Sequence, residues 1–229
     1  MRTPHRRAAL ALLAAGLAAG GALAQEKTTA HPIKSLFKYL DAYYTKIPAA
    51  DRDRFTLAYY LRQGGAPPPP GTKVYVVQGT QRTQLAMAPS GKVELPSLAL
   101  LNSKATVTVD KPSPNVKLGF SMGLEPTARP ATQLPAGELA AAIDQSNRGI
   151  KRAAGVLGMA VPKMGSVRGV GAGSGEVVLA DGRRAPLPVL GGAPAFIPAS
   201  WPNARTVVFA TTPARLEIGG LPKPAKGKK

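Results

Sequence analysis

Apolar and polar residues alternate along this chain in two ways, one typical of helices and one typical of strands. Apolar residues at helical spacing occur first between Ser35, which we expect to cap a helix, and Pro48, which we expect to end it. The apolar stripe of this helix consists of Leu36, Leu40, Tyr43 and Ile47. A second segment with helical spacing covers 138–157. The chain is therefore expected to contain two main helices.

Each predicted helix is followed by a series of short strand predictions. In 55–62, apolar residues at every second position alternate with Thr56, Ala58, Tyr60 and Arg62, which is a strand pattern. The other strands of the first series are predicted at 73–78, 83–87, 92–95, 105–110 and 116–122. The second series is predicted at 176–180, 185–189, 195–197, 206–210 and 215–218. This order predicts an α+β fold with short antiparallel strands.

The two series also resemble each other in sequence. Residues 73–98 align without a gap with residues 175–200, and prolines and asparagines fall at equivalent turns. In this alignment Trp201 falls near Leu100 or Leu101, which predicts a half-buried apolar turn rather than a ligand platform. We therefore expect two related β-rich modules in tandem, each with a preceding helix, at 25–128 and 129–220. Chance similarity between two β-rich halves is the alternative.

The first 24 residues have the order of a secretory signal peptide. Arginines precede an apolar stretch over 8–19, and Ala22 and Ala24 occupy the positions that a signal peptidase reads. Cleavage is expected after Ala24, which predicts a periplasmic or secreted protein without a transmembrane span in the remaining chain. The chain contains no cysteine, so neither a lipid-anchored cysteine nor a disulfide is expected.

The charge of the chain is strongly positive, with a formal net charge of +18. Residues 221–229 are interpreted as a flexible basic tail whose lysines contact anionic surfaces. These lysines are Lys223, Lys226, Lys228 and Lys229. The expected partners are lipid head groups, lipopolysaccharide, a cell-wall polymer or an envelope protein. Nucleic acid is not expected as a partner, because the sequence has no platform of basic and aromatic residues. Export would also separate the protein from the nucleic acids inside the cell.

Residues for common catalytic mechanisms are missing from the sequence. The only histidines are His5 and His31, so thiol catalysis, Ser-His-Asp hydrolysis and histidine-based zinc sites have no support. The carboxylates are spread singly along the chain, and the glycine-rich segment 169–175 is interpreted as a connector rather than a phosphate loop. No catalytic, cofactor-binding or metal-binding residue is predicted.

Three aromatic residues are the remaining candidates for contact with a ligand. Most of them are expected in the core between helix and sheet, while Tyr44, Tyr60 and Trp201 are the candidates for exposure. The sequence as a whole predicts an exported, cationic, non-catalytic binding or scaffold protein of the bacterial cell envelope. Two alternatives stay open: a carboxylate-dependent envelope enzyme such as a carbohydrate hydrolase, and an assembly subunit that pairs through an exposed sheet edge.

Overall fold

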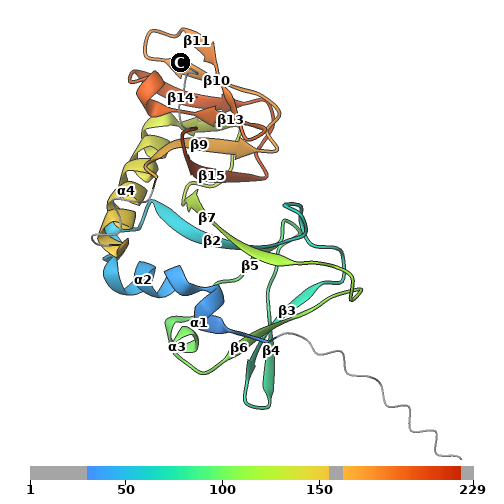
Figure 1. Ribbon diagram of the computed structural model, residues 1–229. Coiled ribbons are helices and arrows are strands. Elements are labelled where there is room, and N and C mark those ends of the chain that lie inside the picture. The colour runs from blue at the N-terminus through green and yellow to red at the C-terminus, as the bar shows by residue number, and fades with distance from the viewer. Residues whose placement is uncertain (1–29, 155–161, 223–229) are drawn as a thin grey trace, which may run out of the picture.

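A computed structural model describes residues 30–154 and 162–222 and has a mixed α+β fold (Figure 1). The α-helices are α1 (Ile33–Leu36), α2 (Lys38–Lys46), α3 (Leu98–Leu101) and α4 (Ala136–Ala154). The strands up to α4 are β1 (His31–Pro32), β2 (Phe55–Arg62), β3 (Lys73–Gln78), β4 (Gln81–Leu85), β5 (Lys92–Val93), β6 (Thr106–Asp110), β7 (Gly119–Pro126) and β8 (Gln133–Pro135). The strands after α4 are β9 (Met164–Val170), β10 (Gly175–Leu179), β11 (Arg184–Pro186), β12 (Val189–Leu190), β13 (Ala193–Phe196), β14 (Ala204–Phe209) and β15 (Arg215–Gly220).

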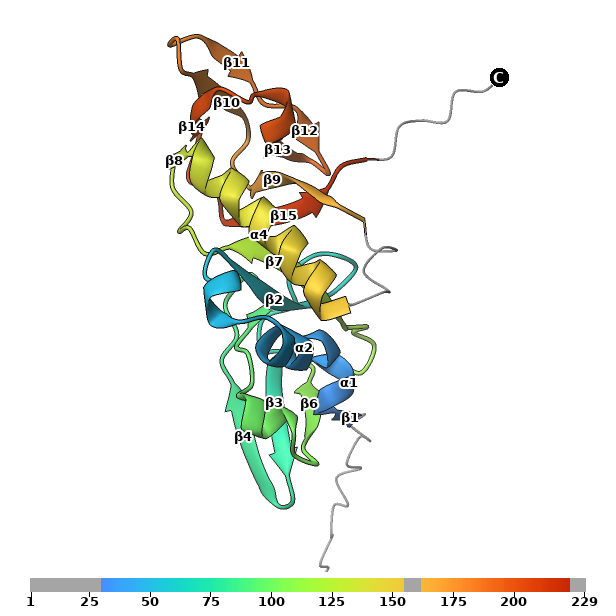
Figure 2. The same cartoon turned by 90° about the vertical axis from the view of Figure 1, so that its left-hand side faces the viewer.

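A seven-stranded sheet with the order β12-β13-β9-β15-β7-β2-β5 forms the centre of the molecule. Two four-stranded sheets, β1-β6-β3-β4 and β11-β10-β14-β8, lie at opposite ends of it (Figure 1). The pairs of neighbouring strands are antiparallel. Figure 2 shows α4 lying across the strands of the central sheet, where it contacts β2, β7 and β9. No helix in the described ranges is long and apolar enough to cross a membrane.

The alternation in β2 decides which side chains enter the core. Phe55, Leu57, Tyr59 and Leu61 are buried on the side that faces the helices. The ring of Phe55 lies edge-on to Tyr43 of α2, with 5.7 Å between the centroids, and the Tyr43 hydroxyl donates to the Phe55 carbonyl at 2.9 Å. Tyr60 and Arg62 therefore point to the opposite face of the sheet, since successive side chains alternate.

Two buried or half-buried amides on α4 connect it to both halves of the chain. The Gln145 side chain accepts from the Arg54 backbone N–H at 2.8 Å and donates to the Ala50 carbonyl at 3.2 Å, ahead of β2. The Asn147 side chain accepts from the Met164 backbone N–H at 2.8 Å and donates to its carbonyl at 3.0 Å, at the start of β9. One helix thus holds the residues ahead of β2 in one half and the start of β9 in the other.

The same order of strand pairing occurs before and after α4. β2 pairs with β7 and β5, β3 with β4 and β6, and β6 with β1. After α4, β9 pairs with β15 and β13, and β10 pairs with β11 and β14; β14 also pairs with β8, which directly precedes α4. This order is compatible with two related modules. Strands from both sides of residue 128 nevertheless share the central sheet.

The register of pairing differs by one residue from the sequence alignment of the two halves. Val76 lies opposite Val107, and Val177 lies opposite Val207, and all four are buried. Val76 is therefore equivalent to Val177, whereas the alignment of 73–98 with 175–200 places half-buried Tyr75 there. A slip of one residue reverses the faces of a strand, so the buried positions of the two halves match in a register one residue away from that of the alignment.

Several sequence predictions need correction. Ser35 lies inside α1, where its hydroxyl donates to the Pro32 carbonyl, so it does not cap the helix. Strand β7 covers Gly119–Pro126 rather than 116–122, and β9 was not predicted at all. The predicted signal peptide, residues 155–157 of the predicted second helix and the four tail lysines lie outside the described residues.

The buried hydroxyl of Tyr59 leads to a prediction about alkaline stability. Tyr59 is 2% exposed, its hydroxyl has no hydrogen-bond partner among the described residues, and burial raises its pKa to about 12. Above about pH 10 the Tyr59 hydroxyl ionises in the unfolded chain but stays neutral in the folded one, because its folded pKa is higher. The free energy of unfolding is therefore unaffected by ionisation of this group below about pH 10 and falls as the pH rises toward 12. We expect Tyr59→Phe to leave the free energy of unfolding at pH 7 unchanged, or to raise it by up to about 1 kcal/mol. The free energy of unfolding of Tyr59→Phe should also fall less between pH 10 and pH 12 than that of the original protein.

Urea unfolding at pH 7 and pH 11 measures both effects. Tyr39→Phe removes a hydroxyl from a side chain that is 51% exposed and serves as the matched control. A loss of more than about 1 kcal/mol for Tyr59→Phe at pH 7 would show that the hydroxyl has a hydrogen-bond partner after all.

Candidate functional site

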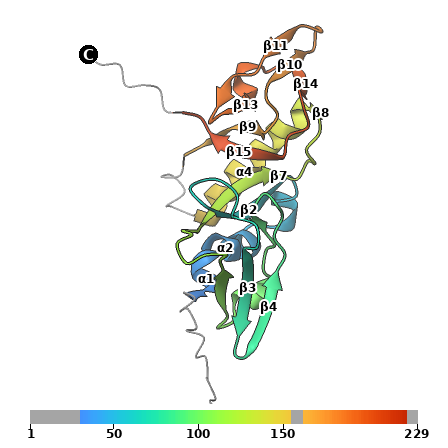
Figure 3. The same ribbon diagram turned by 90° about the vertical axis from the view of Figure 1, so that its right-hand side faces the viewer.

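In the central sheet, the strands β12, β13, β9 and β15 are paired with the strands β7, β2 and β5 through a single residue pair. β7 and β15 pair only through Leu124 and Ile218, although β7 pairs with β2 along its whole length. A cleft of about 710 Å³ lies at this junction, lined by residues of β2, β7, β9 and β15. Figure 3 shows these four strands in the middle of the molecule. Its charged lining residues are Arg62, Lys117, Arg168, Arg215 and Glu217. The cleft is therefore predominantly basic.

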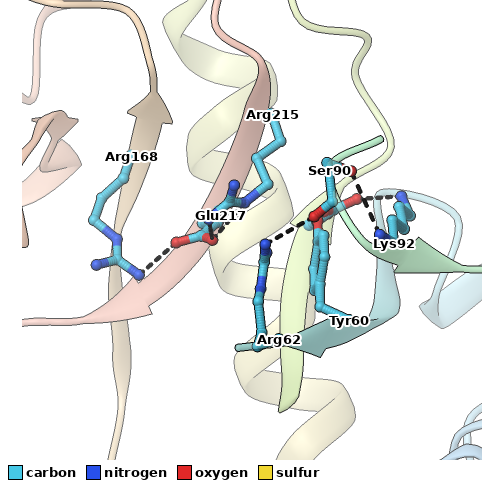
Figure 4. Close-up of polar contacts among 8 residues, drawn as sticks. Tyr60, Arg62, Ser90, Lys92, Arg168, Arg215 and Glu217 are labelled. Atoms are coloured by element: carbon cyan, nitrogen blue, oxygen red, sulfur yellow. Dashed lines mark hydrogen bonds and ion pairs between the residues drawn. The ribbon is translucent and has the colours of Figure 1, made fainter. Parts of the chain in front are cut away.

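Strand register brings these side chains to one face. Arg168 of β9 lies directly opposite Glu217 of β15, and residues opposite each other in a ladder point to the same face. On β2, Arg62 and Tyr60 point away from the helices, because successive side chains of a strand alternate and Phe55, Leu57, Tyr59 and Leu61 face the helices. Figure 4 shows Arg62 and Tyr60 on β2 at one side of the cleft, and Arg168, Arg215 and Glu217 on β9 and β15 at the other side.

Glu217 is held by two arginines. Its Oε2 accepts from Arg168 Nη2 at 2.7 Å, and its Oε1 accepts from Arg215 Nε at 2.7 Å. The side chains of Arg168, Arg215 and Glu217 are 30%, 24% and 20% exposed, so this ion pair network is partly buried. Arg168 Nε is also buried and has no partner among the described residues. Both oxygens of this carboxylate are thus occupied by guanidinium groups.

Tyr60 connects a second carboxylate to the cleft. Its hydroxyl donates to Glu125 Oε1, and Lys92 Nζ donates to Glu125 Oε2 at 2.5 Å. Burial, together with the hydrogen bond to Glu125, raises the pKa of Tyr60. Tyr60 was expected among the exposed aromatics but is only 3% exposed. The physical reason is that Arg62 and Arg215 lie over its ring, with guanidinium carbons 4.3 and 5.3 Å from the centroid.

Arg62 carries the positive charge that the network leaves without a carboxylate. Its Nη1 donates to the Ser90 carbonyl at 2.7 Å, and no ion pair to it is found within the described part of the chain. Burial and the nearby charge of Arg215 lower the pKa of Arg62. Arg62, Lys92, Arg168 and Arg215 together face two carboxylates, Glu125 and Glu217. The site therefore has an excess of positive charge.

The other predicted site residues lie elsewhere. Tyr44 is half-buried in α2, where its ring lies 5.3 Å from that of Tyr43 and 5.0 Å from the guanidinium carbon of Arg52. Trp201 is half-buried and stacks on buried Phe196, with centroids 6.3 Å apart. Its ring therefore packs inward. The structure does not bring Tyr44 or Trp201 to the cleft.

Sequence reasoning did not single out the arginines of the cleft. Arg62 and Arg215 both occupy polar positions of alternating segments, and this signal was present in the predicted strands. Arg168 had no such signal, because it lies in the glycine-containing segment 164–170, which was not recognised as a strand.

Searches against protein-family models, curated proteins and solved structures find no match for this chain. In the described residues, no group of three or more potential metal-ligating side chains occurs.

Proposed function

We propose that this chain is a binding protein that holds an anionic group in the basic cleft between β7 and β15. The observation that carries the proposal is the position of Arg62, which lies beside Arg215 over one tyrosine ring and has no carboxylate partner in the described ranges. Like charges that are brought together in a partly buried site repel each other, and a bound anion relieves that repulsion. Guanidinium groups present the planar donors that carboxylates and phosphates accept.

The carboxylates of the site support binding over hydrolysis. A carboxylate-dependent hydrolase needs one carboxyl group that can give up a proton and another that can act as a base or nucleophile. Glu217 is paired with Arg168 and Arg215, and Glu125 is bonded to Tyr60 and Lys92. Each oxygen of these two carboxylates thus already accepts a hydrogen bond from a neighbouring side chain, so neither residue presents an unpartnered carboxylate oxygen to a substrate.

The proposal includes the setting that the sequence indicates. Residues 1–24 have the order of a signal peptide, which directs the chain to the bacterial envelope. There the net charge of +15 that remains after removal of the three arginines of residues 1–24 attracts anionic lipid head groups, lipopolysaccharide, cell-wall polymers or acidic envelope proteins. The lysines at 223, 226, 228 and 229 follow shortly after β15 in sequence and add salt-sensitive attraction.

A pair of matched arginine variants tests the proposal. Arg62→Gln removes a charge from the cleft, whereas Arg183→Gln removes one from a turn, where the Arg183 side chain is 74% exposed. The probes are poly-L-glutamate and phosphatidylglycerol vesicles, with dissociation constants measured at two salt concentrations. We expect Arg62→Gln to weaken binding of at least one probe about tenfold or more, because a charge-assisted hydrogen bond contributes roughly 1.5–3 kcal/mol. Arg183→Gln should weaken it by less than about twofold.

A chain that ends at Pro222 separates the cleft from the tail. This shortened chain lacks the four tail lysines, and it should bind both probes more weakly than the full chain, mainly at low salt. If Arg62→Gln and Arg183→Gln weaken binding equally, the attraction is spread over the whole surface and the cleft is not the site.

A further inference from the structure

One side of β7 lacks a neighbouring strand over most of its length. Backbone N–H and C=O groups of a strand alternate between its two sides, so half of those in β7 point toward β15. β15 pairs with β7 only at Leu124, and no hydrogen bond reaches the groups of Gly119–Met122 on that side within the described ranges. Such a row of unpaired groups is a template for another strand.

The cleft face of β7 is open along this edge. A Cβ atom placed on Gly119 or Gly123 would have no neighbouring atom within 4 Å, and the side chain between them is the small Ser121. The cleft lined by β7 and β15 lies against the same segment. An added strand would therefore meet no side chain of β7 on the cleft face.

The two faces of this edge differ in chemistry. On the cleft face, Arg62, Arg168 and Arg215 gather around the network of Glu217. On the other face, Phe120 and Met122 lie opposite Leu61 and Tyr59, and Met122 is 42% exposed. A strand beside β7 shows alternate side chains to these same two faces.

We infer that the ligand of the cleft is an extended polypeptide segment in which acidic and apolar residues alternate, and that it adds to the open edge of β7 as a strand. This inference rests on the proposed function, since the same arginines receive the acidic side chains. Backbone hydrogen bonds to Gly119–Met122 supply affinity, and the alternation supplies selectivity. A phosphate-bearing head group satisfies the arginines but offers no alternating backbone donors and acceptors to the edge.

Synthetic peptides of fixed charge test the inference. The probe is the capped heptapeptide Glu-Val-Glu-Val-Glu-Val-Glu, and the control has the same composition with the four glutamates first and the three valines last. Two further peptides carry N-methyl groups on all glutamates or on all valines, which removes the backbone donors of one side of the strand. Fluorescence anisotropy measures the dissociation constants, and amide hydrogen exchange follows Gly119–Met122.

We expect the alternating peptide to bind at least tenfold more tightly than its rearranged control. One of the two N-methylated peptides should lose at least tenfold in affinity, because only one set of donors faces β7. Binding should also slow amide exchange between Gly119 and Met122. Gly123→Val, which places a side chain in the open space of the cleft, should weaken the alternating peptide at least tenfold. Gly137→Ala, at an open position in the first turn of α4, should leave that affinity unchanged.

Three results would overturn the inference. Equal binding of the alternating and rearranged peptides would show that charge alone acts, and equal binding of both N-methylated peptides would exclude backbone pairing. Binding of phosphatidylglycerol vesicles that depends on Arg62, without binding of any peptide, would identify a head group as the ligand. In these three cases the proposal that the cleft binds an anion is not contradicted. That proposal is contradicted if Arg62→Gln weakens binding of peptides, poly-L-glutamate and vesicles no more than Arg183→Gln does.

Discussion

Replacing Phe55 with alanine is expected to lower the free energy of unfolding by about 3–5 kcal/mol. Phe55 is 1% exposed, packs edge-on against Tyr43 of α2, and lies against α4 at Gly149. A Cβ on Gly149 would approach Phe55 Cζ to 2.7 Å, so the helix can lie close to the ring only because this residue is glycine. Loss of the ring leaves a cavity between both helices and β2, and the surrounding backbone can collapse only partly.

Urea unfolding followed by circular dichroism measures this loss. Leu98→Ala removes a leucine that is 37% exposed in α3 and serves as the control, with an expected change below about 1 kcal/mol. A loss of less than about 1.5 kcal/mol for Phe55→Ala would mean that the two helices close over the vacated space.

Gly169→Val is expected to destabilise the protein by about 3 kcal/mol for the opposite reason, overpacking. Phe209 of β14 is 2% exposed, and its ring lies on the backbone of β9 at this glycine. The Phe209 Cζ and Cδ1 atoms lie 2.8 and 2.9 Å from the position that a Cβ would occupy. Because the ring is also close to Gly175, it cannot move aside without disturbing β10.

Gly123→Val provides the matched control for this substitution. Both glycines lie in strands of the central sheet, but a Cβ on Gly123 would have nothing within 4 Å. We expect the free energy of unfolding of this variant to stay within about 0.5 kcal/mol of the original protein, or to rise slightly, since valine suits a strand better than glycine. The fluorescence of Trp201, which stacks on Phe196, reports unfolding of the second half independently of circular dichroism. Equal stability of the two variants would contradict the packing of Phe209.

The α+β class and several strands could be predicted because their signal is local. β2 and β3 have the bounds that alternation or flanking turn residues indicated. β9 was missed because two of its seven residues are glycines, which are normally unfavourable in strands. Gly169 is explained by the ring of Phe209, which is forty residues away in sequence. A contact of this kind leaves no periodic trace near β9.

The candidate site was even less accessible to sequence reasoning. Arg62 and Arg215 come from opposite halves of the chain and meet only because β7 and β15 are neighbours in the sheet. Tyr60 was expected to be exposed because it lies on the face of β2 opposite the apolar residues, yet Arg62 and Arg215 lie over its ring on that face. The positions of single charges on strands could be predicted, but the strand order that combines them could not.

The two amides of α4 have a mechanical consequence. Gln145 is bonded to the residues before β2, and Asn147 is bonded to the first residue of β9, whereas β7 and β15 share one residue pair. A force that pulls the two halves apart would meet little resistance in the sheet, where one pair must open. It would instead act on the bonds of Gln145 and Asn147, which hold one helix to both halves. The helix thus supplies more polar contacts between the two halves than the backbone pairing of the sheet junction does.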